Sequence, residues 1–151
     1  MSDYPMLISN KLHSFRNFVL QIYRDSLLQC KEVPSNVRAF ITAPTLLFHK
    51  KYDDAIHILD STYQSYTPYS RNAGIIAYSL ASAYQGKNDR ENTIKYFAIS
   101  AISDVLNGAR ENLSLKILAK LIFESGDIDR ASKYMKNAME DAILCNARIN
   151  T

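Results

Sequence analysis

The chain has 151 residues, which is enough for one domain with a hydrophobic core and too few for two domains of ordinary size. Hydrophobic residues make up 47% and charged residues 22%, and this composition is typical of a globular protein. The net charge is +3, and the basic residues stand singly among acidic ones, which argues against a nucleic-acid-binding surface. No run of about 18 apolar residues and no secretory signal pattern occurs, so no segment of this chain is expected to span a membrane.

Residues 6–31 are predicted to form one helix that ends before the segment Val33-Pro34-Ser35-Asn36. The prediction rests on apolar residues at helical spacing: Leu12, Phe15, Val19, Ile22, Tyr23 and Leu27. This helix either caps the first repeat described next or is the second helix of a preceding, incomplete repeat.

A period of 38 residues runs through the rest of the chain. It aligns Ala43, Ala81 and Ala119, and five further columns each keep one class of side-chain size in three copies. Three of these columns lie in the second half of each copy: Ala55, Thr93 and Ala131; Leu59, Phe97 and Met135; and Thr62, Ser100 and Ala138. Because small side chains at fixed positions let two helix axes approach closely, the period predicts a repeated helix–helix packing.

Each copy is predicted to be two amphipathic helices joined by a short polar turn. The repeats cover about residues 36–70, 71–108 and 109–148. Asparagine, aspartate or glycine in the turn ends the first helix, and the acidic residues that follow, such as Asp53, Asp89 and Asp127, cap the second. Pro44 falls inside the first helix of the first copy, where it must kink the helix or delay its start.

The residues of the third copy resemble the tetratricopeptide repeat, whose usual unit has about 34 residues. They are Leu118, Ala119, Ile122, Gly126, Asp127, Ala131, Tyr134 and Ala138. The second copy matches with Thr93 in place of the usual alanine, and the first copy is the weakest match. The resemblance implies one all-α domain over residues 1–151, a right-handed superhelical stack of antiparallel helix hairpins. The four extra residues per unit predict longer second helices or longer links, such as residues 65–68.

A closer resemblance covers about residues 40–150 and concerns the repeat region of membrane-bound regulators from Bacteroides. It is carried by residues 98–105, 126–131 and 140–148. Those regulators resemble two-component sensors, with a periplasmic repeat region, one membrane helix and a cytoplasmic output part. An apolar stripe that continues to the last residues indicates that the natural chain goes on. The resemblance implies a periplasmic sensor region; a free-standing chain is expected in the cytoplasm.

The first helix of each pair is expected to line the concave side of the stack. Alignment with the tetratricopeptide pattern assigns the following residues to this groove: Val37, Phe40, Ile41, Leu47, Tyr78, Ser79, Ser82, Gln85, Lys116, Lys120 and Phe123. Such a groove is apolar at one end and basic at the other, which suits an extended or helical peptide with an acidic part. In the alternative arrangement, the N-terminal helix folds over Phe40 and Ile41 and fills that end itself.

No motif for catalysis, a metal or a cofactor emerges from the sequence, so the chain is not expected to be an enzyme. His13, His49 and His57 form no metal-binding pair, and the paired acids stand where helix starts favour negative charge. Cys30 and Cys145 are far apart and are expected to be buried hydrophobes; they can pair only if the two ends of the chain meet. Tyr84, Tyr96 and Tyr134 are expected in the core, whereas the link tyrosines, Tyr63, Tyr66 and Tyr69, either pack beneath the link or offer a binding edge.

The sequence therefore predicts a non-catalytic module that binds a protein or peptide, as the sensory part of a larger membrane-bound regulator. A free-standing adaptor that positions partners in an assembly is the first alternative. A helical-repeat RNA binder is the second, because hairpins of about 35 residues also recognise RNA. Against RNA binding, the groove has only two lysines, and no polar pair recurs from copy to copy. Neither the ligand nor the oligomeric state follows from the sequence.

Overall fold

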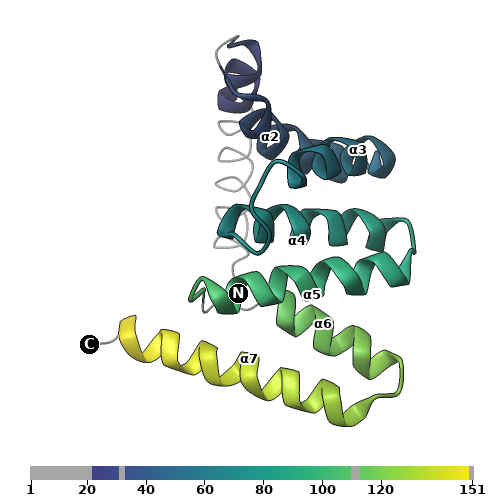
Figure 1. Ribbon diagram of the computed structural model, residues 1–151, viewed down its shortest axis with the longest axis vertical. Coiled ribbons are helices and arrows are strands. Elements are labelled where there is room, and N and C mark those ends of the chain that lie inside the picture. The colour runs from purple at the N-terminus through teal and green to yellow at the C-terminus, as the bar shows by residue number, and fades with distance from the viewer. Residues whose placement is uncertain (1–21, 31–32, 110–112, 150–151) are drawn as a thin grey trace, which may run out of the picture. The chain divides into compact units, whose positions relative to one another are not determined.

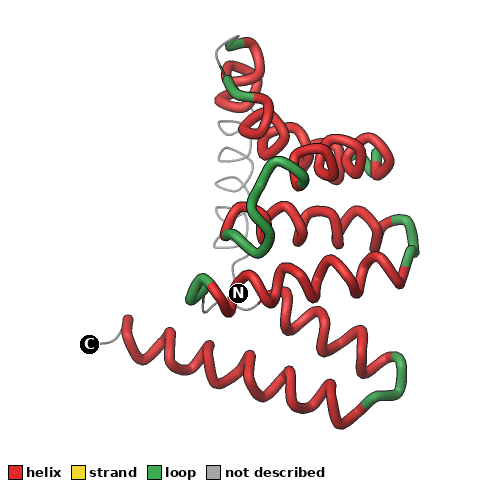
Figure 2. Tube along the Cα trace, viewed as in Figure 1, coloured by secondary structure: helices red, strands yellow, loops and turns green. Residues whose placement is uncertain are grey.

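The computed structural model describes residues 22–30, 33–109 and 113–149. All regular secondary structure in these ranges is helical, and no strand occurs among them (Figure 2), so the all-α prediction is confirmed. The chain divides into two compact units, Met1–Ile41 and Thr42–Thr151.

In the first unit, residues 22–29 are helical, and α2 (Ser35–Phe48) begins directly after Pro34. The guanidinium of Arg38 donates hydrogen bonds to the backbone carbonyls of Leu28 (2.8 Å), Cys30 and Val33 (3.1 Å). Carbonyls at the end of a helix have no intrahelical partner, so Arg38 caps the helix over residues 22–29 with a cation. The part of the predicted helix before residue 22 lies outside the described residues.

Helix α2 contains Pro44 in its interior. Of the two expected effects of this proline, a delayed helix start is excluded, because α2 begins nine residues earlier, at Ser35. Proline removes its own N–H donor, and its ring crowds the carbonyl four residues earlier, but the residues after it keep their donors. After it, the turn is closed by hydrogen bonds from the N–H of His49 to Thr45 (3.1 Å) and from the N–H of Lys51 to Leu46 (2.9 Å).

The second unit continues from the end of α2 with five further described helices: α3 (Tyr52–Tyr63), α4 (Arg71–Gly86), α5 (Arg90–Leu106), α6 (Leu113–Glu124) and α7 (Ile128–Ile149). From α3 to α7, each helix packs against the next one in the chain. Helices α4 to α7 run alternately in opposite directions (Figure 1), as expected for stacked hairpins. The pair α4–α5 lies within the predicted second repeat, and α6 and nearly all of α7 lie within the predicted third repeat.

Most positions of the repeated columns lie in the core of this unit. The alanine column, Ala43, Ala81 and Ala119, is buried, and so are Ala55, Thr93 and Ala131. The largest fully buried side chains include Leu59, Ile76, Leu80 and Phe97. Small residues therefore stand where helices approach one another, and larger ones fill the space between them.

The turns within the repeats have one geometry. Lys50, Asn88 and Gly126, which are 38 residues apart, have left-handed backbone angles, with φ of 58°, 60° and 90°. Each is followed by the N-cap position of the next helix. The carboxylate of Asp89 accepts the N–H of Asn92 (3.1 Å), and that of Asp127 accepts the N–H of Arg130 (3.0 Å), as predicted. The first repeat differs, because Lys51 at this position makes no side-chain cap bond.

The residues by which each repeat exceeds the usual length of about 34 lie both in a longer helix and in the links between helices. Helix α5 has 17 residues, and residues 64–70 link α3 to α4. At the end of this link, the hydroxyl of Ser70 caps α4 by accepting the N–H of Ala73 (3.3 Å). Tyr63 was expected in the link but is the last residue of α3.

Candidate functional site

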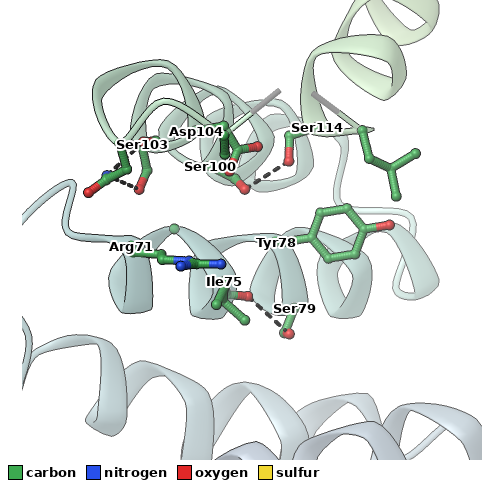
Figure 3. Close-up of a pocket in the computed structure, with 12 residues that line it drawn as sticks. Arg71, Ile75, Tyr78, Ser79, Ser100, Ser103, Asp104 and Ser114 are labelled. Atoms are coloured by element: carbon green, nitrogen blue, oxygen red, sulfur yellow. Dashed lines mark hydrogen bonds between the residues drawn. The ribbon is translucent and has the colours of Figure 1, made fainter. Parts of the chain in front are cut away.

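A pocket of about 500 Å³ lies between α4, α5 and the start of α6 in the second unit. Two of the predicted groove residues, Tyr78 and Ser79, line it. Its other walls include Arg71 and Ile75 of α4, Ser100, Ser103 and Asp104 of α5, the C-cap residue Asn107 of the same helix, and Leu113 and Ser114 of α6. Figure 3 shows the α4 side chains on one side of the pocket and the serines of α5 and α6 on the other. We call this cavity the α4–α5–α6 pocket.

A close approach between α4 and α5 sets one end of the pocket. A Cβ atom at Gly74 would lie 2.6 Å from the Cβ of Ser103, so only glycine fits at this position of α4 without a shift. The hydroxyl of Ser103 lies within hydrogen-bonding distance of the carbonyls of Tyr69 (3.1 Å) and Ser70 (2.9 Å). The Asn107 amide also donates to the Tyr69 carbonyl (2.9 Å). These bonds hold the start of α4 against the end of α5.

A pair of buried hydroxyl groups forms the other end of the pocket. The Ser100 and Ser114 Oγ atoms lie 2.8 Å apart and join α5 to the first turn of α6. Both side chains are buried, and a buried hydroxyl without a partner is costly, so this pair specifies how α6 sits on α5. Most hydroxyl groups of the pocket wall are therefore engaged within the protein.

Besides the half-buried carboxylate of Asp104, the groups that face a ligand are of three kinds. Arg71 is exposed and brings a positive charge, and Ile75 and Leu113 are exposed apolar side chains. The half-buried ring of Tyr78 is held edge-on against Phe97, with ring centroids 5.5 Å apart. A cation beside apolar and aromatic surface can bind a peptide through an acidic and an apolar side chain. The pocket lining contains no histidine or cysteine, and no group of three potential metal ligands occurs among the described residues.

The other predicted groove residues are dispersed. Val37, Phe40 and Ile41 belong to the first unit, so their place in a common groove stays a prediction. Leu47, Ser82 and Lys116 are half-buried, Gln85 lines a separate cavity of about 280 Å³ beside Arg90, and Lys120 and Phe123 are exposed on α6.

Three tyrosines form an aromatic cluster that joins α3, α4 and α5. The rings of Tyr84 and Tyr96 stack with centroids 5.5 Å apart, and Tyr63 meets Tyr96 edge-on at 6.2 Å. Burial raises the pKa of both Tyr84 and Tyr96, and the negative charge of Asp60 raises it further. The phenols stay neutral at physiological pH, as packing groups require. Tyr63 therefore packs against Tyr96 of α5, whereas Tyr69 is exposed.

The remaining candidates for chemistry lie apart from the pocket. His49 and His57 are exposed, and His13 lies outside the described residues. Cys30 is free and exposed, contrary to the expectation of a buried side chain; it stands just after the helix over residues 22–29, where no neighbouring helix covers it within the described part of the first unit. The side chain of Cys145 lies outside the described residues.

Sequence reasoning missed the α5 side of the pocket. Ser103, Asp104 and Asn107 lie near the end of a second helix, whereas only first helices were expected to line the groove. A glycine inside α4 was the available signal, because glycine within a helix of small residues indicates a close approach of another backbone.

Comparison with known families gives a match that covers almost the whole chain. The model of the SusR N-terminal TPR domain, in which TPR stands for tetratricopeptide repeat, matches residues 9–151. Neither a curated protein nor a solved structure matches significantly. Within the described residues, no helix is both long and apolar enough to cross a bilayer. TPR domains are in general non-catalytic modules that bind other proteins. Since the match extends over far more than half of its length, the chain belongs to the SusR N-terminal TPR domain family.

Proposed function

We propose that the chain is the ligand-binding, sensory part of a larger membrane-bound regulator, and that it works in the periplasm. The family match supports this proposal, together with the resemblance of residues 40–150 to the repeat region of Bacteroides regulators. In this role the module acts by docking and by a change of shape, without chemistry of its own.

The α4–α5–α6 pocket is the proposed ligand site, and its ligand is a peptide segment with an acidic and an apolar side chain. The carrying observation is that Arg71, Ile75, Tyr78 and Leu113 converge on one cavity at the junction of two repeats. A ligand that spans this junction contacts both hairpins, so its binding energy can bias the angle between them. This is how a helical stack can transmit a signal from a bound segment.

A library of random dodecapeptides displayed on phage tests the site. We expect selected peptides to combine an acidic residue with an aromatic or aliphatic one, and to lose binding to Arg71→Glu. Arg71 stands in the first turn of α4, where an acidic residue suits the helix dipole, so this variant remains folded. Lys133→Glu, which makes the same charge change on an exposed position of α7, is the matched control. Peptides that bind both variants equally would place the ligand elsewhere.

The membrane-bound regulator is tested by the reading frame that contains this segment. The proposal predicts a hydrophobic stretch of about 20 residues followed by a cytoplasmic output region. A reading frame without them would favour a free-standing cytoplasmic adaptor. In either case, we expect no RNA binding at low salt, where electrostatic binding to nucleic acid is strongest.

A further inference from the structure

The end of α5 carries the one asparagine–glycine sequence of the chain, Asn107-Gly108. Asn107 is the C-cap residue of α5 and is exposed, and Gly108 follows it with a left-handed φ of 67°. Within the described residues, no atom beyond its chain neighbours lies within 4 Å of the place that a Cβ of Gly108 would take. The backbone nitrogen of Gly108 is therefore shielded neither by a side chain of its own nor by one of a neighbouring element.

An asparagine before a glycine is the sequence most open to deamidation, because the attacking nitrogen has no side chain beside it. The backbone nitrogen of Gly108 loses its proton to hydroxide and attacks Cγ of Asn107. A C–N bond forms, the bond from Cγ to Nδ2 breaks, and the amide nitrogen takes up a proton and leaves as ammonia. Water then opens the resulting succinimide ring at either carbonyl and yields aspartate or isoaspartate. The step consumes water and neither oxidises nor reduces any group.

The native hydrogen bonds of Asn107 and Gly108 restrain both reacting groups. The Nδ2 atom of Asn107, which would leave, donates to the carbonyls of Tyr69 (2.9 Å) and Ser103 (2.7 Å). The N–H of Gly108, which would attack, donates to the carbonyl of Val105 (3.2 Å). Because the reaction requires both groups to be released, the folded chain slows it.

We propose that Asn107 is a deamidation site that is protected while these hydrogen bonds hold, and that its conversion to aspartate or isoaspartate loosens the start of α4 from the end of α5. Asn107 lines the α4–α5–α6 pocket, so the conversion also adds a negative charge to the wall of this pocket. The proposal does not depend on the ligand proposed there.

The loosening follows from the hydrogen bonds that the product cannot make. A carboxylate accepts hydrogen bonds but donates none, so it would face the carbonyl oxygens of Tyr69 and Ser103 without a proton between them. The end of a helix carries a partial negative charge, which disfavours an anion there. Of the side-chain bonds described between α5 and this link, only those of the Ser103 hydroxyl to Tyr69 and Ser70 would remain.

Ageing of the whole chain at mildly alkaline pH tests the site. One sample is kept in native buffer and one is unfolded in guanidinium chloride, and peptide mapping by mass spectrometry measures the conversion of each asparagine. In the unfolded chain, we expect Asn107 to convert faster than every other asparagine. In the native chain, we expect conversion of Asn107 to be at least about tenfold slower, because the native hydrogen bonds must open first.

The variant Asn107→Asp reproduces one product and tests the loosening. We expect its melting temperature to fall by several degrees and the backbone N–H of Gly74, which donates to Ser70 in the first turn of α4, to exchange at least about fivefold faster by NMR. Asn137→Asp makes the same change at an exposed position of α7 and is the matched control, for which neither shift is expected. Aged native chain, separated from unmodified chain by anion exchange, gives the same comparison without a substitution.

The proposal fails in any of three cases. If Asn107 converts no faster than the other asparagines of the unfolded chain, it is not a deamidation site. If it converts equally fast in the native and the unfolded chain, the native hydrogen bonds do not protect it. If Asn107→Asp and Asn137→Asp have the same melting temperature and the same exchange at Gly74, the conversion does not loosen α4. Protection in the native chain, together with faster Gly74 exchange only in Asn107→Asp, would support the proposal.

Discussion

Helices α5 and α7 are the second helices of neighbouring repeats, and they share the same sequence period with very different surroundings. Helix α5 packs on both α4 and α6 and buries Thr93, Tyr96, Phe97 and Ser100, among others. Of the α7 side chains that the structure describes, only Ala131 and Ala138 are buried.

The buried polar residues of α5 all have hydrogen-bond partners within the protein. The Thr93 hydroxyl donates to the carbonyl of Asp89 (2.6 Å), Ser100 pairs with Ser114, and Ser103 bonds to the link before α4. Each buried hydroxyl thus has a partner, as the low polarity around it requires. The equivalents of Thr93 and Ser100 in α7 are alanines. The comparison shows that a repeated pattern determines which residues can face a neighbour, whereas the presence of a neighbour determines whether they are buried.

The largest expected loss of stability comes from a substitution in α5 at a position that is also present in α7. Phe97→Ala should lower the free energy of unfolding by about 3–5 kcal/mol, because it leaves a cavity where Tyr78 packs. Met135→Ala at the equivalent position should lower it by only about 1 kcal/mol, since much of that side chain is already in water. Urea denaturation followed by circular dichroism measures both. Equal losses would show that α7 is covered in the free chain.

A second prediction concerns the closeness of α4 and α5. Gly74→Ala should destabilise the protein by about 1–3 kcal/mol, because the new methyl group meets the Cβ of Ser103 and the helices must separate. Gly86→Ala is the matched control. Its methyl group meets the ring of Tyr52, which can rotate away, so a smaller loss is expected. Thermal unfolding of the two variants would contradict this account if Gly74→Ala melted at or above the temperature of Gly86→Ala.

The smallest expected changes in stability come from the helix caps, which act locally and do not depend on packing between helices. Asp127→Ala should cost about 1 kcal/mol although α7 is exposed on one side, because the cap bond to Arg130 is local. Lys51→Asp should stabilise the first repeat by up to about 1 kcal/mol by adding the cap that this turn lacks. Both values come from the same denaturation experiment. A destabilised Lys51→Asp variant would mean that the backbone at residue 51 cannot present a cap.

Most of the fold was predictable from the sequence because it follows from local signals. Asp89 and Asp127 mark their helix starts, and the buried alanine column Ala43, Ala81 and Ala119 marks where helices cross. The path of the first repeat was less predictable. Pro44 is a strong helix breaker by propensity, yet α2 continues through it with Ala43 buried beside it, because tertiary packing can override local propensity.

The candidate site was predictable only in part. Tyr78 and Ser79 follow from the position of the first helix in a tetratricopeptide hairpin, but Ser103 and Asn107 depend on how the link before α4 folds back. That path includes Tyr69 with a left-handed φ of 59°, which no rule of local sequence foretells for a tyrosine. Contacts between segments more than 30 residues apart, such as Asn107 with Tyr69, are a property of the folded chain.

The left-handed backbone conformation at the turns suggests a way to stabilise the protein. Lys50, Asn88 and Gly126 hold the same backbone position with three different side chains, so the hairpin requires a conformation there and not a particular residue. Glycine adopts this conformation freely, asparagine tolerates it, and lysine does so at a cost of about 1 kcal/mol. Lys50→Gly is thus a route to a more heat-resistant domain that leaves every binding surface untouched. A β-branched residue at any of the three turns would instead open the hairpin from its closed end.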